Sequence, residues 1–135
     1  KNDNSFLLQL RDFSPSIVLP GHWGAFGGAI ESEESVLDAV YRELWEEIRY
    51  KPHVIHKFQE FTDCGQILHV YYSLLELPLS NLVLSEGLEM SLFSIDKILT
   101  GRLLSKNNSE YYPVAPILLE ILKIFLNKSS DLFAK

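Results

Sequence analysis

Three glutamates near the middle of the chain could do chemistry by their type and spacing: Glu43, Glu46 and Glu47. At the helical period of 3.6 residues per turn they fall within an arc of roughly 100°. Carboxylates three and four residues apart repel one another, and the negative end of a helix dipole disfavours them further. A hard cation such as Mg²⁺ reverses this balance, because it binds carboxylate oxygens and commonly bridges them to substrate phosphates. The cluster therefore indicates a divalent metal site.

Two neighbouring glycines, Gly27 and Gly28, precede the glutamates. Because glycine has no Cβ atom, the backbone can approach another group closely at these positions. We expect a backbone carbonyl of this pair to join the carboxylates as a metal ligand. The plainer alternative is a solvated helix face on which Arg42 pairs with Glu46.

The helix that must position the glutamates has signals at both ends. Ser35 predicts an N-cap, and Asp38 stands three residues later, as in a capping box. Pro52 cannot extend a helix, which predicts an end near Arg49. An apolar residue recurs at every fourth position and predicts a buried stripe: Val36, Val40, Leu44 and Ile48.

The rest of the sequence predicts a mixed α/β domain. Loop residues fill 11–24, and Ser94 predicts the cap of a short helix over 95–99. Runs rich in β-branched and aromatic residues predict strands over 5–10, 24–30, 53–61 and 67–77, and a further strand that ends at 94. A second long helix is expected over 113–126. We expect one domain over residues 1–135, without repeats or linkers. The opening Lys1–Asn4 reads as a turn entering a strand, which leaves open that the first strand of the fold is lacking.

Composition narrows the class of function. The chain has 135 residues, 47% of them hydrophobic, and a formal charge of −6. An acidic domain is a poor general binder of nucleic acid, whose affinity comes largely from Lys and Arg. A lone Cys64 and the absence of an apolar run of about 18 residues lead us to expect a cytoplasmic protein with neither a nucleic-acid nor a membrane partner.

The charged residues match a known pattern. Gly28 is followed after five residues by Glu34, and after seven more by Arg42-Glu43-Leu44, one residue and Glu46-Glu47. This order resembles the Nudix box, Gly-x5-Glu-x7-Arg-Glu-U-x-Glu-Glu-x-Gly-U, in which U is a bulky aliphatic residue. The chain departs from the pattern at two places: Arg49 replaces the second glycine, and Tyr50 replaces the last aliphatic residue. Before the pattern, Phe26 stands where many relatives have proline.

The resemblance to Nudix (MutT-like) hydrolases implies an α/β/α sandwich with a mixed sheet. It also implies Mg²⁺- or Mn²⁺-dependent hydrolysis of a nucleoside diphosphate linked to another group, X. Glu43, Glu46 and Glu47 would be metal ligands together with a carbonyl of Gly27 or Gly28, Arg42 would orient the acids, and Glu34 would hold the loop and helix together.

The resemblance leaves several roles open. The general base is either a glutamate of the box or a later one, Glu86 or Glu89, of which Glu86 is slightly favoured. Arg11 could reach a phosphate, although a lone arginine at a strand end is more often simply exposed. Trp23 could stack on a nucleobase, and packing in the core or against a loop is an equal alternative for it.

Two other functions stay open. One is a nucleotide-sugar hydrolase that cleaves at the glycosidic carbon, and the other is a Nudix-fold binding or regulatory module without activity. The second is disfavoured because every box acid is present. The expected partner is a small nucleotide-type molecule, and a homodimer fits the family.

Overall fold

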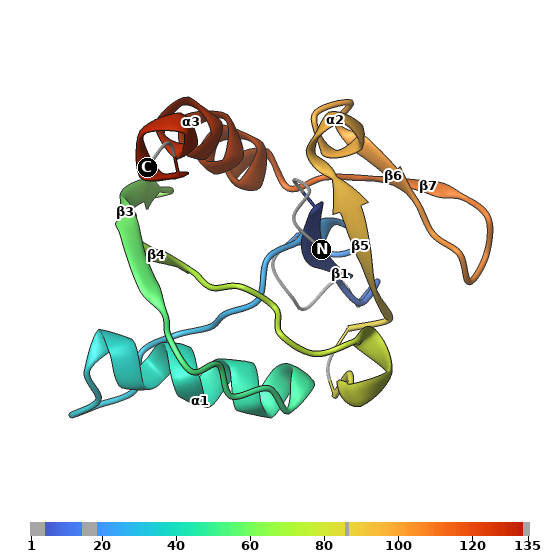
Figure 1. Ribbon diagram of the computed structural model, residues 1–135. Coiled ribbons are helices and arrows are strands. Elements are labelled where there is room, and N and C mark those ends of the chain that lie inside the picture. The colour runs from blue at the N-terminus through green and yellow to red at the C-terminus, as the bar shows by residue number, and fades with distance from the viewer. Residues whose placement is uncertain (1–4, 15–18, 86, 134–135) are drawn as a thin grey trace. The chain divides into compact units, whose positions relative to one another are not determined.

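The computed structural model describes residues 5–14, 19–85 and 87–133 (Figure 1). Its chain divides into two compact units: unit 1 contains Lys1–Ala25 and Gly87–Lys135, and unit 2 contains Phe26–Glu86. The expectation of a single domain stays a prediction. No helix in the described part of the chain is both long and apolar enough to cross a bilayer.

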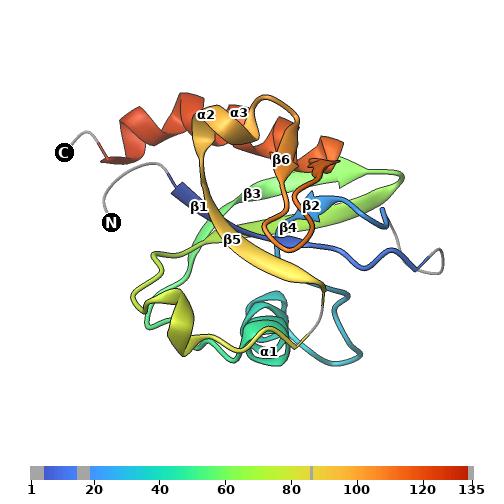
Figure 2. The ribbon, with the colours of Figure 1, turned by 90° about the vertical axis from the view of Figure 1, so that its right-hand side faces the viewer.

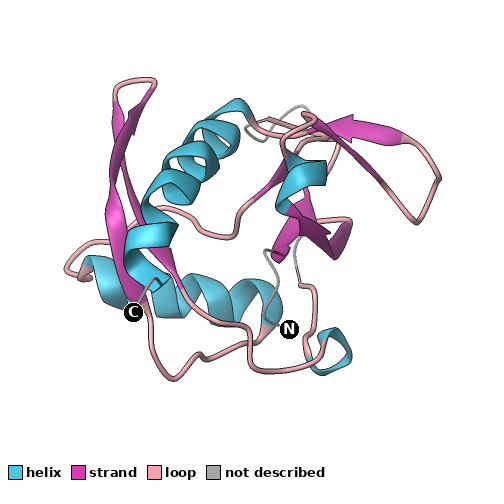
Figure 3. Cartoon of the chain, turned by 45° about the horizontal axis from the view of Figure 1, so that its top comes forward, coloured by secondary structure: helices cyan, strands magenta, loops and turns pink. Residues whose placement is uncertain are grey.

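Unit 2 contains the helix with the glutamates, α1 (Val36–Ile48), and a two-stranded antiparallel sheet. The strands β3 (His56–Asp63) and β4 (Gln66–Tyr72) form the long hairpin drawn in magenta in Figure 3. Its turn uses Cys64 and Gly65, both with positive φ, as tight hairpin turns require. A short 3-10 helix, η1 (Leu79–Asn81), follows the hairpin.

Unit 1 contains a three-stranded antiparallel sheet in the order β2-β1-β5, formed by Trp23–Gly24, Ser5–Leu10 and Glu89–Ser94 (Figure 2). A second antiparallel hairpin joins β6 (Arg102–Leu104) and β7 (Tyr111–Pro113). One parallel bridge, between Trp23 and Val114, gives the strand pairing its mixed character. Two helices complete the unit: α2 (Ile95–Ile98) and α3 (Pro116–Phe133).

The core of unit 1 is built from alternate residues of the sheet and one side of α3. Its members are among the most buried of the chain: Leu8, Leu10, Trp23, Phe93, Ile98, Leu103, Leu118 and Leu122. Trp23 has no exposed surface, its Nε1 donates a hydrogen bond to Leu103 O at 3.1 Å, and its ring meets Phe93 edge-on at 4.8 Å.

Several elements were predicted correctly. The strand over 5–10, the helix that starts after Ser35 and the short helix that starts after Ser94 are confirmed. The α/β class is confirmed as well.

The predicted strand over 24–30 is wrong, because only Trp23–Gly24 pair there. The backbone beyond them bonds to side chains of α1 instead of a neighbouring strand: Gly27 N donates to Glu47, and Ala29 O accepts from Arg42. The long helix starts at Pro116 rather than at 113, because residues 111–113 pair with β6. Proline at the first helical position loses no hydrogen bond there.

Candidate active site

The helix α1 is fixed at both ends by short-range bonds. Ser35 Oγ accepts from Asp38 N at 3.0 Å, which confirms the N-cap. Arg49 adopts the left-handed conformation (φ 55°, ψ 43°), and its N donates to Trp45 O at 3.0 Å. The last carbonyls of the helix, those of Glu47 and Ile48, would lack partners within it, and they accept instead from Ser85 N at 2.8 Å and Val83 N at 3.1 Å.

The departure at Tyr50 has a structural reason. Tyr50 is buried, and its hydroxyl donates to Leu74 O at 3.0 Å and accepts from Glu76 N at 3.2 Å. An aliphatic residue would fill the same space but leave both backbone groups without this partner. The tyrosine therefore ties the end of α1 to the segment that follows β4.

Arg42 is the centre of the acidic cluster. Its guanidinium binds Glu34 through two bonds, Nε to Oε2 at 2.7 Å and Nη2 to Oε1 at 3.0 Å. Nη1 donates to Glu43 Oε2 at 3.0 Å and to Glu46 Oε1 at 3.2 Å, and Nη2 also donates to Ala29 O at 2.9 Å. One cation thus gathers three carboxylates from the loop and the helix, which is the arrangement that bidentate arginine pairs favour.

The contacts between Arg42 and Glu34 shift the pKa values of both residues. The bond to Arg42, and then the bond from Glu31 N, lower the pKa of Glu34 below its ordinary value. The bond to Glu34, and then the one to Glu43, raise the pKa of Arg42 above its ordinary value. Folding lowers the pKa of Glu34, so its ionised carboxylate stabilises the fold at pH values above the ordinary pKa of a glutamate. This stabilisation is lost as the pH falls through the lowered pKa of the folded state.

The loop that carries Glu34 is a tight turn. Glu34 N donates to Glu31 O at 3.1 Å, Glu31 N donates to Glu34 Oε1 at 2.9 Å, and Glu33 between them has a φ of 66°. This turn holds the carboxylate of Glu34 against Arg42. Glu31 itself comes within 3.6 Å of Arg42 Nη1.

The glycine pair lies against the glutamates of α1. Gly27 N donates to Glu47 Oε1 at 3.2 Å, and Glu47 is only 3% exposed. At Gly28, an added Cβ atom would stand 2.7 Å from Glu43 Oε1, so the carboxylate at the flexible end of the Glu43 side chain would have to move to make room for it. Glycine at position 28 therefore lets the backbone approach this carboxylate where it stands.

The donor set suits a hard cation, since Glu43, Glu46 and Glu47 offer carboxylate oxygens from one helix face. As the side chains stand, no three acidic, histidine or cysteine residues of the described ranges converge closely enough to hold a metal ion. Arg42 engages Glu43 and Glu46, and the amide of Gly27 engages Glu47. The residues thus fit a divalent ion by chemistry, and the single positive charge of Arg42 is shared among Glu34, Glu43 and Glu46.

Comparisons with known proteins identify the family of the chain. The family model of the NUDIX domain matches residues 1–116. The chain belongs to the Nudix family. Members of this family are hydrolases that act on nucleoside diphosphate derivatives and generally use divalent metals. No curated protein matches the chain.

Solved structures confirm the Nudix fold. A MutT protein from Methanosarcina mazei Go1 is 24% identical, with a TM-score of 0.69 over 93% of this chain and 85% of that one. A mutT/nudix family protein from Listeria innocua is 20% identical, with a TM-score of 0.69 over 96% and 83% of the two chains. The E. coli ORF135 protein is 23% identical, with a TM-score of 0.66 over 100% and 89%. At these identities the likeness establishes the fold alone.

Two candidates for the general base lie beyond the Nudix box. Glu86 lies outside the described residues. Glu89 begins β5 in unit 1 and is buried, with both carboxylate oxygens accepting hydrogen bonds: Oε1 from Ser105 Oγ at 2.6 Å and Oε2 from Lys106 N at 2.9 Å. Glu89 therefore holds the start of the loop between β6 and β7 through these hydrogen bonds. A catalytic role for Glu89 stays a prediction.

The two substrate-binding candidates differ. The prediction that Trp23 stacks on a nucleobase is wrong, because its ring is fully buried in the core of unit 1 and no face is left for a ligand. Arg11 is half-buried just after β1, and its N donates to His22 O at 2.9 Å. Its role towards a phosphate stays a prediction.

Sequence reasoning missed two partners of Arg42, Glu31 and the carbonyl of Ala29. The only signal for Glu31 was its place in the acidic turn before the helix. A backbone carbonyl gives no sequence signal at all.

Proposed function

We propose that this protein is a Mg²⁺- or Mn²⁺-dependent pyrophosphohydrolase. In this reaction water attacks a phosphorus atom of a nucleoside diphosphate linked to X, and the phosphoanhydride bond breaks. The observation that carries the proposal is the network in which Arg42 holds Glu34, Glu43 and Glu46 together beside the close-packed Gly28. Glu43, Glu46 and Glu47 still repel one another at their three- and four-residue spacings, and a bound cation would relieve that repulsion.

Each residue of the network has a separate task. Glu43, Glu46 and Glu47 would hold the metal, with a carbonyl of Gly27 or Gly28 as a further ligand. When bound, the metal would polarise the diphosphate, balance the charge of the leaving phosphate and lower the pKa of a water molecule. Arg42 would orient the carboxylates through its bonds to Glu43 and Glu46.

The base that accepts the proton of the attacking water must stand within hydrogen-bond reach of it, directly or through one more water. Glu86 is the favoured residue, because both oxygens of Glu89 already accept bonds from Ser105 and Lys106. If neither of these glutamates is the base, Glu43 or Glu46 takes its place.

We also infer the class of substrate and the cellular compartment. The substrate would be a small nucleotide-type molecule, and nucleic acid would be excluded by the charge of −6. Cys64 is exposed and free, which suits the reducing conditions of a cytoplasm.

Product analysis in H₂¹⁸O tests the proposal and separates the alternatives. With Mg²⁺ and a panel of nucleoside diphosphate derivatives, attack at phosphorus gives a nucleoside monophosphate and phosphoryl-X, with ¹⁸O in one of the phosphates. A nucleotide-sugar hydrolase that attacks the glycosidic carbon gives a nucleoside diphosphate and a sugar that carries the ¹⁸O. An inactive binding module gives no product with any substrate.

A matched pair of variants ties the products to the box. We expect Glu46→Gln to lose product formation, and Glu120→Gln, an exposed acid on α3, to keep it. Equal activity of the two variants would contradict the assignment of Glu46.

A further inference from the structure

One nitrogen of the Arg42 guanidinium has more carboxylates near it than it has hydrogens to share. An arginine side chain has five N–H groups, and those of Arg42 all have an acceptor: Glu34 twice, Ala29 O, Glu43 and Glu46. Glu31 Oε2 lies 3.6 Å from Nη1, which is about 0.8 Å beyond the length of a charge-assisted hydrogen bond. Glu31 therefore stands next to the guanidinium without bonding to it.

The two sides of the guanidinium bind different kinds of group. Nε and Nη2 are held by Glu34, at 2.7 and 3.0 Å, and by Ala29 O, at 2.9 Å. Only Nη1 bonds to metal-ligand candidates, Glu43 and Glu46. Arg42 thus keeps its place if these two carboxylates turn away, but Nη1 then loses both acceptors. The side chain of Arg42 is only 21% exposed, so leaving Nη1 without acceptors costs free energy.

Glu31 is positioned to replace the lost acceptors. Its N donates to Glu34 Oε1 at 2.9 Å, and its carbonyl oxygen accepts from Glu34 N at 3.1 Å. The backbone of Glu31 is therefore held by the same carboxylate that holds Arg42. Its own side chain is 68% exposed, so the carboxylate can move towards Nη1 without displacing a packed neighbour.

We propose that Glu31 is a positioning residue for metal binding. When Glu43 and Glu46 turn to a divalent cation, the carboxylate of Glu31 accepts the Nη1 hydrogens that they release. Glu31 thereby lowers the cost of loading the site, and it acts through Arg42 rather than by contact with the cation. The inference rests on the proposed function, which assigns Glu43 and Glu46 to the metal.

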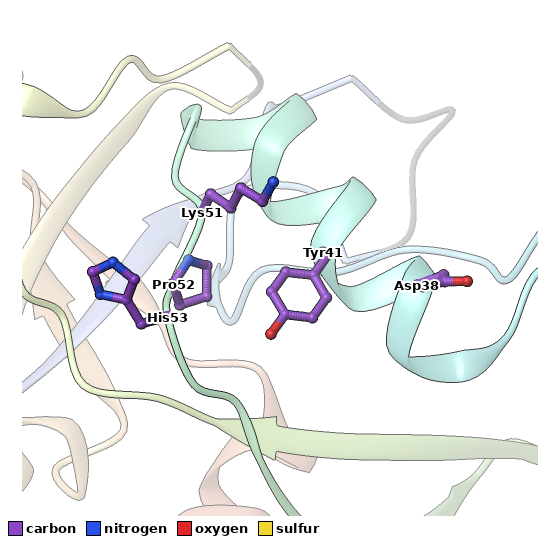
Figure 4. A pocket seen from close by; sticks show the side chains of 5 residues that line it. All are labelled: Asp38, Tyr41, Lys51, Pro52 and His53. Atoms are coloured by element: carbon purple, nitrogen blue, oxygen red, sulfur yellow. The ribbon is translucent and has the colours of Figure 1, made fainter.

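Two other acids near the start of α1 are placed differently. Asp38 lines a hollow of about 550 Å³, whose other lining residues are Tyr41, Lys51, Pro52 and His53 (Figure 4). Glu33 shares the turn of Glu31 and is exposed. Within the described ranges, the ion pairs of Arg42 include neither Asp38 nor Glu33. Glu31 is therefore the carboxylate held in reserve for Nη1.

Calorimetric titration of the full chain with Mn²⁺, in the absence of substrate, tests the proposal. We expect Glu31→Ala to raise the Kd of Mn²⁺ by about two- to fivefold, the range expected for a partly exposed ion pair. Glu33→Ala is the matched control, because it removes one exposed carboxylate from the same turn, and it should leave the Kd unchanged within error. Equal effects of the two variants would assign the loss to the general negative field and overturn the proposal.

A conservative variant tests whether Glu31 acts as an acceptor. Glu31→Gln keeps an acceptor oxygen at the same reach, so its Kd should lie between those of the wild type and Glu31→Ala. A Kd equal to that of Glu31→Ala would contradict the proposal.

Thermal unfolding separates metal loading from a structural role. In EDTA, Glu31→Ala should melt at the wild-type temperature, because its carboxylate is not bonded to Nη1 in the metal-free arrangement. With Mn²⁺, the rise in melting temperature should be smaller than in the wild type. An equal fall with and without Mn²⁺ would make Glu31 a structural residue of the turn and overturn the proposal.

A double-mutant cycle excludes direct ligation by Glu31. In an Arg42→Met background, Glu31→Ala should not change the Kd further, whereas a direct ligand would still lose affinity. If this background does not fold, the ¹⁵Nη signals of Arg42 decide. With Mg²⁺ bound, rotation of Nη1 should be slow in the wild type and faster in Glu31→Ala, and equal rotation would overturn the proposal.

Failure of this inference is distinguishable from failure of the proposed function. Metal-dependent hydrolysis by the wild type, combined with wild-type Mn²⁺ affinity in Glu31→Ala, contradicts the inference alone. Mn²⁺ binding that depends on Glu31 as expected, without hydrolysis of any substrate, contradicts the proposed function alone.

Discussion

Replacing Arg49 by glycine should stabilise the fold, although the arginine makes contacts that glycine cannot. Arg49 ends α1 in the left-handed conformation, with φ 55° and ψ 43°, at the position where the Nudix box has glycine. An L-residue with a side chain pays about 1–2 kcal/mol in that region, and glycine pays nothing. The strain is thus built into the helix end that presents Glu46 and Glu47.

Two losses offset part of this gain. Glycine increases the conformational freedom of the unfolded chain, which costs about 0.4–1 kcal/mol. The variant also loses the contact between the Arg49 guanidinium and the Trp45 ring, which at an exposed site is worth about 0.5 kcal/mol. The gain less these losses lies between about −0.5 and +1 kcal/mol, and its midpoint is slightly positive. We therefore expect a small net increase in the free energy of unfolding, or a rise of a few degrees at most in melting temperature for a domain of this size.

Urea denaturation measures the change, at one low protein concentration so that self-association does not enter. Arg49→Ala is the control, because it removes the same guanidinium but keeps a Cβ atom in the left-handed region. We expect the order of stability to be Arg49→Gly above wild type and Arg49→Ala below it. If Arg49→Gly proves less stable than Arg49→Ala, the left-handed strain is not the dominant cost at this position and the reasoning is wrong.

Four further predictions concern candidate residues of the site: Glu47, Gly28, Glu89 and Glu86. Glu47→Gln should lower turnover by at least about 100-fold, because a charge assigned to metal binding is lost, while the melting temperature in chelator stays the same or rises as repulsion at the end of α1 is relieved. Gly28→Ala should lower turnover by displacing the Glu43 carboxylate, whereas Gly24→Ala, which meets nothing within 4 Å, should not. Neither glycine has a positive φ, so equal losses in the two variants would contradict a role for close approach. Glu89→Ala should lower stability by about 1–3 kcal/mol, because Ser105 Oγ and Lys106 N both lose the buried carboxylate that accepts from them. Glu86→Gln should instead lower turnover with no loss of stability, and a wild-type rate for it would move the base into the box.

The parts of the site that could be predicted from sequence depend on short-range order. Ser35 as the N-cap and the end of α1 at Arg49 follow from residues within one turn of each end. The pairing of Arg42 with Glu46 follows from their four-residue spacing on the helix, whereas the contact of Arg42 with Glu43 was implied by the family resemblance alone. Each of these features is determined by residues that are close together in the sequence.

The parts that could not be predicted depend on distant contacts. Trp23 is buried because its indole reaches a carbonyl 80 residues away, and no local pattern separates that role from an exposed ring. The short strands β6 and β7, three residues each, are too brief to show an alternating pattern. The segment after Gly24 has strand-like composition, but its backbone groups at Gly27 and Ala29 bond to side chains of α1.

Removal and return of metal tests the central claim most directly. Hydrolysis of a nucleoside diphosphate derivative by the wild-type chain is followed with Mg²⁺, then with an excess of EDTA, and then with Mg²⁺ or Mn²⁺ added beyond the chelator. We predict that turnover vanishes in EDTA and returns with either metal, because Glu43, Glu46 and Glu47 face an anionic substrate and need a cation between them. Full turnover in excess EDTA would contradict the account.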